Sequence, residues 1–462
     1  MLDSRFLSRT PAALLLAAIP ALGAGSALAA EWRVEQDGSA DFTVIQDAID
    51  AASDGDTVTV GPGGYSESLL VDAKWIVLRS RTGADDTVIS NGYAARAIEV
   101  RRSGNPLVVM DLGFVQNRAG GLEFPGGAGG TIVTLAAPLA VHRCRFEQSL
   151  ATGVGGAIYC RTGYVPGVGN PRPADDPSAV RLLVEDCTFV GNFAGDEGGA
   201  LFADEAPVAV TGTRFEDNDA VGGGAVAVLD APLFVSGSEF LDNSVAVFGG
   251  AISFTGLGAV TLLDSAFREN RSEGLGGAVR IHQALSAFVS GCVFTDNEAS
   301  NNGGALHVEF APLMLETTLF AGGVANRGGG LYVRNGEATV MRCSFVDNSA
   351  SAGSSLEIEQ TEAEVTASVF ADAASNATSC RVGTTISSGC NAGIDGAGGC
   401  VGIGARIEVE RCPADPDVFC RTFEEEDCGE LGHTTEPCPS QDECITSVET
   451  ATWGGLKILY RD

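Results

Sequence analysis

The sequence predicts an all-β protein, a right-handed parallel β-helix (solenoid) with about three short strands in each coil. Three observations predict this fold class: a recurring phenylalanine, aliphatic columns in register with it, and glycine pairs at one place in each repeat. From Phe189 onward, neighbouring members of the phenylalanine column are 25 to 27 residues apart. A fixed period of this length indicates that each repeat is one unit stacked on the next. The column comprises Phe114, Phe146, Phe189, Phe215, Phe240, Phe267, Phe294, Phe320, Phe345 and Phe370.

Two aliphatic columns ahead of the phenylalanine predict the first strand of each coil. The residue five before it is Val or Leu in all ten repeats, and the residue seven before it is Leu, Val or Ala. Such alternation is typical of a strand whose alternate side chains face inward. The step of three from the valine column to the residue two before Phe breaks the alternation, so the chain must bend there.

An asparagine three residues after the phenylalanine predicts a turn. Asn tolerates left-handed backbone, bonds its neighbours in turns, and forms amide ladders when copies are stacked. It is present in seven of the ten repeats, as Asn117, Asn192, Asn218, Asn243, Asn270, Asn297 and Asn348.

Glycine pairs followed by an apolar residue, such as Gly249-Gly250-Ala251-Ile252, predict a tight corner and a third strand. Three strands and three corners per repeat describe one turn of a parallel solenoid. A leucine-rich repeat is disfavoured because no helical segment or leucine signature is present, and a β-propeller needs four antiparallel strands in a longer blade.

Three regions are expected: a signal peptide at 1–30, the parallel β-helix at 31–378, and a Cys-rich C-terminal cap or tail at 379–462. In the first, Arg5 and Arg9 precede an apolar stretch at 12–24, and Ala27-Leu28-Ala29 offers a cleavage site. This pattern predicts export, to a secreted or to a cell-surface or outer-membrane-associated location. A membrane anchor fits less well because the stretch is short and contains Pro20, and no other stretch approaches the ~18 apolar residues of a span.

Apolar residues at helical spacing between Asp41 and Ala52 predict a short amphipathic helix that covers the open first coil. This stretch and the following Gly61-Pro62-Gly63-Gly64-Tyr65 resemble the N-terminal part of pectin-lyase-like right-handed β-helix proteins. The Phe-x-x-Asn and Gly-Gly-Ala-Ile repeats resemble those of chlamydial polymorphic outer-membrane proteins and related bacterial surface proteins. Together the resemblances cover about residues 41–375. They imply the fold, whereas activity is not implied because this fold carries both enzymes and adhesins.

Several features of the proteins that the chain resembles are missing from the sequence. Pectate lyases use clustered acidic calcium ligands with a basic Arg or Lys, and pectinesterases use paired aspartates. None of these signature runs is found, and the second arginine at lyase spacing from Arg172 is absent. The chlamydial proteins carry a membrane barrel after the repeats, for which too few residues remain here, so self-transport is not expected.

The net charge of −32 argues against nucleic-acid binding, which depends on basic patches. No cofactor is expected. One acidic column precedes the asparagines, and Ca²⁺ is the ion that such oxygens would bind. Solvated turns are the simpler interpretation, since single carboxylates one coil apart make an incomplete calcium shell. The column comprises Asp217, Asp242, Glu269, Asp296 and Asp347.

The 13 cysteines fall into two sets, with Cys160 alone on another strand. Cys144, Cys187, Cys292 and Cys343 lie two residues before the column phenylalanine and should stack inward. Cys144 and Cys187 are on adjacent coils, which fits either a disulfide or two inert thiols. Eight cysteines between 380 and 444 predict a disulfide framework in an exported chain, and zinc is disfavoured because close Cys-x-x-Cys pairs are absent. The run 452–461 is either a docking or sorting element or a capping strand.

Two insertions, at 161–178 and near 125–134, either line a binding face or are surface loops.

The candidate catalytic residues lie at outward positions of the strand after the glycine corner. They are Arg280, His282, His307, Glu309 and Arg334, with Tyr332, Glu357 and Glu359 continuing the same face. Alternation places them on one exposed face, and three coils span only about 10 Å. Acid–base chemistry is one interpretation, and a solvated face of mixed charges is the other.

Two functions therefore stay open. The first is an exported bacterial β-helix protein that is monomeric, non-catalytic, and presents an elongated binding or adhesive surface to a polysaccharide or cell-surface ligand. The second is a polysaccharide lyase or glycoside hydrolase whose site is on the 280–334 face. The absent signatures and acidic composition favour the first.

Overall fold

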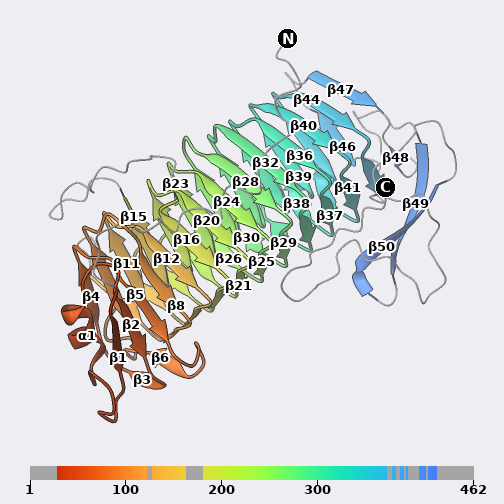
Figure 1. Ribbon diagram of the computed structural model, residues 1–462. Helices are drawn as coiled ribbons and strands as arrows, with labels where there is room; N and C mark the ends of the chain where they lie inside the picture. The colour runs from red at the N-terminus through yellow and green to blue at the C-terminus, as the bar shows by residue number, and fades with distance from the viewer. Residues whose placement is uncertain are drawn as a thin grey trace.

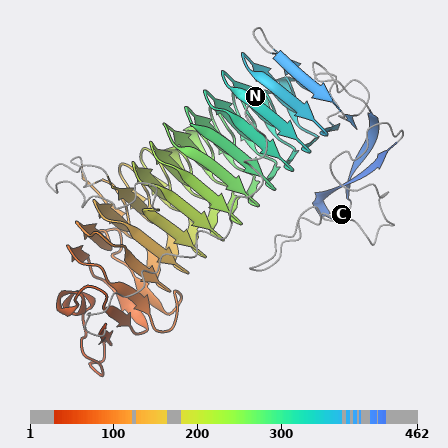
Figure 2. The ribbon, with the colours of Figure 1, turned by 45° about the horizontal axis from the view of Figure 1, so that its top comes forward.

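The chain forms a parallel β-solenoid of the right-handed type with about 12 turns, as the computed structural model in Figure 1 shows. The structure describes residues 29–121, 127–162, 180–371 and 377–380, together with the strands at 385–389, 392–393, 405–412 and 415–423. Successive coils lie side by side in one elongated row from the red to the blue end (Figure 2). The predicted all-β solenoid is confirmed.

Four sheets run along the row, because most coils contain a fourth short strand that the sequence analysis did not predict. Sheet 1 contains β1 Glu31–Val34, β2 Thr57–Val60, β5 Val77–Ser80, β8 Leu107–Met110, β12 Leu139–His142, β16 Leu182–Glu185, β20 Val208–Thr211, β24 Leu233–Ser236, β28 Ala259–Leu263, β32 Ser286–Ser290, β36 Leu313–Glu316, β40 Glu337–Met341, β44 Glu362–Thr366 and β47 Thr385–Gly389. Sheet 2, which carries the phenylalanines, contains β3 Gly63–Tyr65, β6 Thr87–Ile89, β9 Gly113–Val115, β13 Arg145–Glu147, β17 Thr188–Val190, β21 Arg214–Glu216, β25 Glu239–Leu241, β29 Ala266–Arg268, β33 Val293–Thr295, β37 Leu319–Ala321, β41 Ser344–Val346, β45 Val369–Ala371, β48 Ala392–Gly393, β49 Ala405–Cys412 and β50 Asp415–Phe423.

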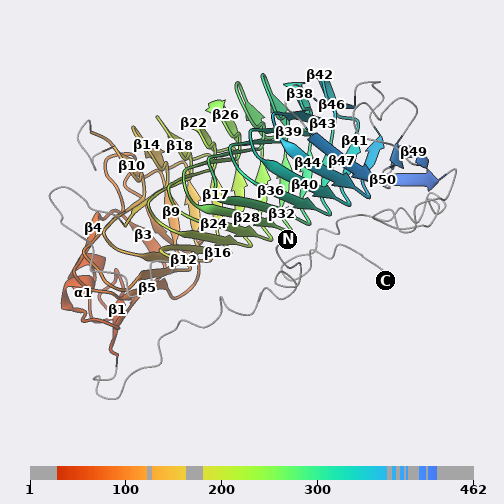
Figure 3. The ribbon, with the colours of Figure 1, turned by 90° about the horizontal axis from the view of Figure 1, so that it is seen from above.

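Sheet 3 is the additional one and follows the asparagine corner. It contains β10 Arg118–Ala119, β14 Leu150–Ala151, β18 Phe193–Ala194, β22 Asp219–Gly222, β26 Ser244–Phe248, β30 Arg271–Ser272, β34 Glu298–Ala299, β38 Val324–Arg327 and β42 Ser349–Ala352. Sheet 4 follows the glycine corner and contains β4 Leu69–Asp72, β7 Ile98–Arg101, β11 Ile132–Leu135, β15 Ile158–Arg161, β19 Leu201–Asp204, β23 Val226–Leu229, β27 Ile252–Thr255, β31 Val279–His282, β35 Leu306–Glu309, β39 Leu331–Arg334, β43 Leu356–Glu359 and β46 Thr378–Cys380. Viewed from above, sheets 1 and 3 lie along opposite sides of the row (Figure 3).

One helix, α1 Ile45–Ala51, lies at the N-terminal end, where the sequence predicted it. Its buried residues Ile45, Ala48 and Ile49 face β1, β2 and β4. The helix has no capping side chain of its own, and the carboxylate of Glu67 accepts the backbone N–H groups of Ile45 and Gln46 instead. A carboxylate at this end satisfies free N–H groups and suits the helix dipole.

The phenylalanine column forms a continuous stack inside the solenoid, as predicted. Neighbouring rings are 4.6 to 5.1 Å apart between centroids and within 12° of parallel. All ten rings are fully buried, and the aliphatic columns of sheets 1 and 4 pack against them. In-register pairing, as in Phe267 beside Phe294, places like residues over one another at every coil.

The asparagine ladder is also present, and it is buried. From Asn192 to Asn297, each amide Nδ2 donates to the Oδ1 of the next asparagine at 2.9 to 3.0 Å. The same Nδ2 also donates to a phenylalanine carbonyl of the preceding coil, as from Asn218 to Phe189 at 3.1 Å. The left-handed residue of this corner is the one before the asparagine, for example Asp217 with φ 54°. The predicted amide ladder is therefore confirmed, whereas the left-handed backbone of the corner belongs to the preceding residue.

The glycine corner requires both of its glycines. Gly249 has φ +65°, and a Cβ there would lie 2.1 Å from the carbonyl oxygen of Ile252. A Cβ on Gly250 would lie 1.9 Å from the carbonyl oxygen of Gly277 in the next coil. The first glycine therefore permits the turn, and the second permits two backbones to approach closely.

Candidate functional site

The predicted site residues lie on consecutive strands of sheet 4, as the sequence analysis expected. Arg280 on β31 pairs in register with His307 on β35, which pairs with Tyr332 on β39. The second column runs from His282 through Glu309 to Arg334. The five candidate catalytic residues therefore share one face of the sheet, on three neighbouring coils.

The first column of that face is buried and the second is only partly exposed, which corrects the prediction of one exposed face. His307 is only 2% exposed and Arg280 is 8% exposed. The segment before each glycine pair folds back over the outer side of sheet 4 and forms bridges from coil to coil, from Phe248 through Leu275 and Asn302 to Arg327. We call this segment the ridge. It covers the first of the two columns that alternation had assigned to solvent.

Contacts between the ridge and the first column explain the burial. The guanidinium of Arg280 lies 4.2 Å from the centroid of the Phe248 ring, and that of Arg327 lies 5.4 Å from the Tyr332 ring. In earlier coils the same outward position carries apolar side chains, which form a second small core. Its members are Ala128, Val133, Leu135, Tyr159, Phe202 and Ala227.

His307 is the most enclosed member of the cluster. Its ring stacks on Tyr332 with 5.0 Å between centroids and 7° between planes. Neither ring nitrogen has a hydrogen-bond partner, and Nε2 lies 3.9 Å from Glu309 Oε2, beyond hydrogen-bond range. Burial lowers the pKa of His307, because the charged imidazolium would lose its hydration.

Glu309 is the electrostatic centre of the cluster. Its carboxylate lies 3.6 Å from Nδ1 of His282 and 3.6 Å from a guanidinium nitrogen of Arg334. The neighbouring His307, with the His282 and Arg334 side chains, lowers the pKa of Glu309. Burial lowers the pKa of His282, and the adjacent Arg280 adds to this. The cluster at neutral pH is thus an ionised glutamate between two neutral imidazoles and two arginines.

A network of charged side chains continues this face toward the C-terminus. A guanidinium nitrogen of Arg327 lies 3.2 Å from Glu357 and 2.8 Å from Glu359. The hydroxyl of Tyr332 donates to Glu359 at 2.8 Å, and burial raises the pKa of that phenol. These pairs join the ridge to sheet 4 and hold the outer layer together.

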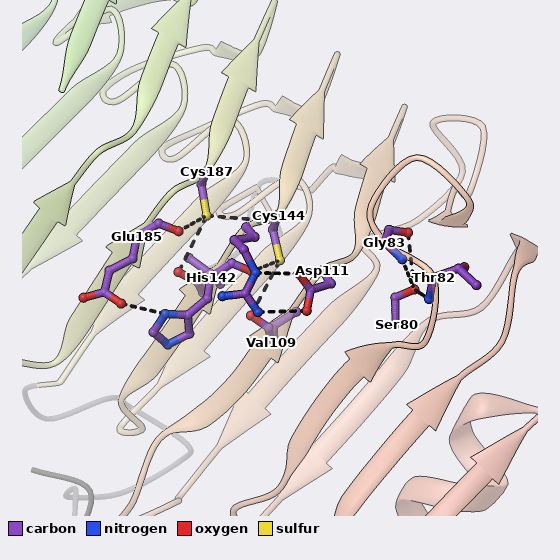
Figure 4. Close-up of polar contacts among 11 residues, drawn as sticks. Ser80, Thr82, Gly83, Val109, Asp111, His142, Cys144, Glu185 and Cys187 are labelled. Carbon is purple, nitrogen blue, oxygen red and sulfur yellow. Dashed lines mark hydrogen bonds and ion pairs between the residues drawn. The ribbon is translucent and has the colours of Figure 1, made fainter. Parts of the chain in front are cut away.

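A second histidine–carboxylate pair was missed by the sequence analysis. His142 on β12 lies in register with Glu185 on β16, and its Nδ1 is 2.8 Å from the glutamate carboxylate (Figure 4). Beside it, Arg143 forms an ion pair with Asp111 at 2.7 Å. Both pairs are on the outer side of the coil. The column alignment contained the signal, because His142 and Glu185 each follow the valine column by one residue.

The cysteines that the structure describes with their side chains are free thiols. Cys144 and Cys187 are buried on adjacent coils, and the Cys144 backbone N–H donates to the Cys187 sulfur at 3.4 Å (Figure 4). The disulfide alternative for this pair is therefore not formed, and burial raises the pKa of the Cys187 thiol. Cys160, Cys292 and Cys343 are likewise buried and free.

The five residues of the acidic column are exposed. Each of them has left-handed backbone at its corner, for example Asp242 with φ 55° and Asp296 with φ 53°. In the part of the chain that the structure describes, no group of three His, Cys, Asp or Glu side chains could hold a metal ion. Residues 1–28 of the predicted signal peptide, most of the 161–178 loop, the terminal run and the side chains of the C-terminal cysteines lie outside the described residues.

Sheet 3 carries a shallow depression of about 330 Å³ that the sequence analysis did not predict. It crosses β18, β22, β26 and β30. Its lining comprises Phe193, Ala194, Asp219, Ala220, Val221, Ser244, Val245, Ala246, Arg271 and Glu273. The residues after the asparagine column could have indicated it, because they combine an exposed aromatic ring with polar side chains.

The fold defines the chain as a parallel β-solenoid protein with a covered outer layer on sheet 4. Residues 186–204 and 291–309 match the Chlamydia polymorphic membrane protein repeat. The chain thus contains repeats of this family, which confirms the resemblance expected from the sequence. Among the residues described, no helix has the length and apolar character needed to cross a membrane.

Other similarities are distant. The metabotropic glutamate receptor-like protein R of Dictyostelium discoideum is 23% identical over 229 residues, which make up 49% of this chain and only 13% of that protein. The catalytic unit of a GH87 α-1,3-glucanase from Streptomyces thermodiastaticus is 14% identical, covers 74% of this chain and 65% of its own, and has a TM-score of 0.36. A mannuronic acid specific polysaccharide family 6 lyase from human gut microbiota is 11% identical, with 79% and 86% covered and a TM-score of 0.36. Similarity this low transfers no activity to the chain.

Proposed function

We propose that this chain is an exported, non-catalytic β-solenoid that presents an elongated surface to a polysaccharide or another cell-surface ligand. The burial of His307 is the observation that carries this proposal. A general base must come within hydrogen-bond reach of the proton that it removes. His307 lies beneath the ridge and against Tyr332, so a polymer cannot approach its ring.

The regular stacking of the coils supports the binding role. With about 4.8 Å between strands, the 14 strands of sheet 1 extend over roughly 60 Å. Solenoids of this kind offer long surfaces on which one ligand touches several repeats. The net charge of −32 favours solubility and repels polyanions.

The ends of the molecule are assigned as part of the same proposal. Residues 1–30 direct export, and the mature protein is a monomer. Helix α1 covers the open first coil with its buried face. The Cys-rich region from 379 onward closes the other end, where the antiparallel pair β49 and β50 follows the last parallel strands.

A second candidate is a polysaccharide lyase or glycoside hydrolase, and one observation favours it. The side chain of His282 is 20% exposed, and its Nδ1 lies 3.6 Å from Glu309 without a hydrogen-bond partner. A neutral imidazole beside a carboxylate can take a proton. In this alternative His282 is the base, Glu309 orients it, and Arg334 binds an acidic group of the substrate, whereas Arg280 and His307 support the site from beneath.

The two candidates are separated by screening the purified mature protein against acidic and neutral glycans, with and without calcium. Binding is followed by calorimetry, and turnover by unsaturated products and reducing ends. We expect binding without turnover. Turnover that is lost in His282→Ala and kept in His142→Ala would replace the binding role by the enzymatic one. The His142 variant is a matched control, because it removes a histidine–carboxylate pair from another sheet.

A further inference from the structure

The depression on sheet 3 has high ends and a low middle. Along its first row, Phe193, Asp219, Ser244 and Arg271 follow one another in register on four coils. At about 4.8 Å per coil these four residues span roughly 14 Å. The two end residues have long side chains and the two middle residues have short ones. The lining also includes Val221 and the small Ala246.

A register shift lies at the same place. Strand β26 contains one more residue than β22 before the glycine corner, so that Gly222 pairs with Phe248 and the pairing shifts between Ala220 and Gly222. Such bulges redirect side chains and are frequent beside binding sites. The hollow therefore coincides with an irregularity in the backbone pairing.

The chemistry of the lining combines an apolar surface with hydrogen-bonding groups. Phe193 is 41% exposed and Val221 is 40% exposed, and both line the same depression. The Ser244 hydroxyl donates to Asp219 at 3.4 Å, and burial raises the pKa of that carboxyl. Arg271 lies 3.7 Å from Glu298 and remains largely exposed, so its guanidinium keeps free donors.

We propose that this depression binds a neutral polysaccharide. The sugar polymer would lie across strands β18, β22, β26 and β30. A sugar ring has an apolar face of C–H groups that fits the Phe193 ring, and a rim of hydroxyls that fits Asp219, Ser244 and Arg271. Sites of this type are mostly apolar with a few placed polar groups. The proposal rests on the binding role proposed above and assigns its ligand and its position.

Charge and strand pairing exclude two other ligands. Asp219 and Glu273 outnumber Arg271 in the lining, and the whole chain is strongly acidic, so a polyuronate would be repelled. An extended peptide would need a free strand edge to add to. Strands β22 and β26 are each paired on both sides, so this part of sheet 3 offers no such edge.

Calorimetric titration of the mature protein with cellohexaose, laminarihexaose, an α-1,3-linked glucan oligomer and hexagalacturonate tests the proposal. We expect one or more neutral oligomers to bind, with an affinity that changes little between low and high salt. Phe193→Ala should weaken this binding about tenfold or more, since exposed aromatic anchors dominate such sites. Phe193→Trp should retain it. Leu257→Ala is the control, because Leu257 is 71% exposed on another corner, and it should bind as the parent does.

The outcomes are distinct. If a neutral oligomer binds equally to the Phe193→Ala variant, the location is wrong while the binding role stands. Preference for hexagalacturonate, weakened by salt, would overturn the neutral class. Binding to no glycan, together with capture of a peptide or protein ligand, would overturn the inference and leave the binding surface itself. Circular dichroism and melting temperatures of both variants should match the parent, because both side chains are exposed.

Discussion

Replacement of Phe294 by alanine tests the stacked interior directly. The Phe294 ring is fully buried and lies 4.7 Å from Phe267 and 4.9 Å from Phe320. Truncation removes both stacking contacts and leaves a cavity that the rigid coils cannot close. Buried Phe→Ala changes cost about 3–5 kcal/mol of unfolding free energy, and stacked aromatic pairs contribute about 0.5–1.5 kcal/mol each within that total. We therefore expect a loss of about 3–5 kcal/mol.

Chemical denaturation measures the total loss, and hydrogen exchange locates it. Stability in a solenoid is a sum of coil terms and interface terms between neighbours, so the loss should concentrate beside the altered coil. Amides of 259–330 should exchange faster, while those near the N-terminal helix should not change. Leu257→Ala is the control, and loss of its 71% exposed side chain should lower the unfolding free energy by less than about 0.5 kcal/mol. A Phe294→Ala variant with the same denaturation curve as this control would refute the inward assignment of the column.

Three further predictions concern other parts of the coil. Asn243→Ala should lower the unfolding free energy by roughly 2–4 kcal/mol, since buried donors of the ladder lose their acceptor, and a melting temperature equal to that of the parent would contradict this. Gly250→Ala should lower the unfolding free energy by about 3 kcal/mol or more, because its Cβ would overlap the backbone of the next coil. Gly237 has open space around it but φ +55°, so Gly237→Ala should lower the unfolding free energy by about 1 kcal/mol in the same denaturation assay. Burial lowers the pKa of His307 below the value of about 6.5 that a histidine has in the unfolded chain. As the pH falls, the unfolded chain is therefore protonated at this histidine before the folded chain is. The unfolding free energy should decrease as the pH drops below about 6.5. His307→Phe should reduce this fall between pH 7.5 and 5 in thermal melts, and an unchanged pH profile would count against the burial.

Local patterns predicted the interior well because each depends on a short-range rule. The alternation in the first strand of a coil, as at Leu233 and Val235, requires only that successive side chains point to opposite faces. The glycine pair requires only a left-handed turn and a close approach of two backbones. The fourth strand was missed because two residues, as in Arg271–Ser272, are too few to give a period.

The error on sheet 4 has a different cause. Alternation established that His307 points away from the first core, but it could not establish what lies outside. The covering ridge comes from a corner that folds back, which is a property of the whole coil. A signal did exist, because Val133, Tyr159 and Phe202 occupy the same outward column in earlier coils. Large apolar residues there are expected only under a cover.

In the seven coils that have the asparagine, it follows the phenylalanine by three residues, while the lengths of the other corners vary. The insertion predicted at 161–178 follows β15, and the one predicted near 125–134 begins between β10 and β11. Neither insertion interrupts the asparagine ladder, because both lie outside the segment between the phenylalanine and the asparagine, which tolerates no additional residue. New sequence can therefore be grafted between sheets 4 and 1 or between sheets 3 and 4, where lengthening a loop costs little entropy. The molecule can in this way diversify its surface while its length and register are preserved.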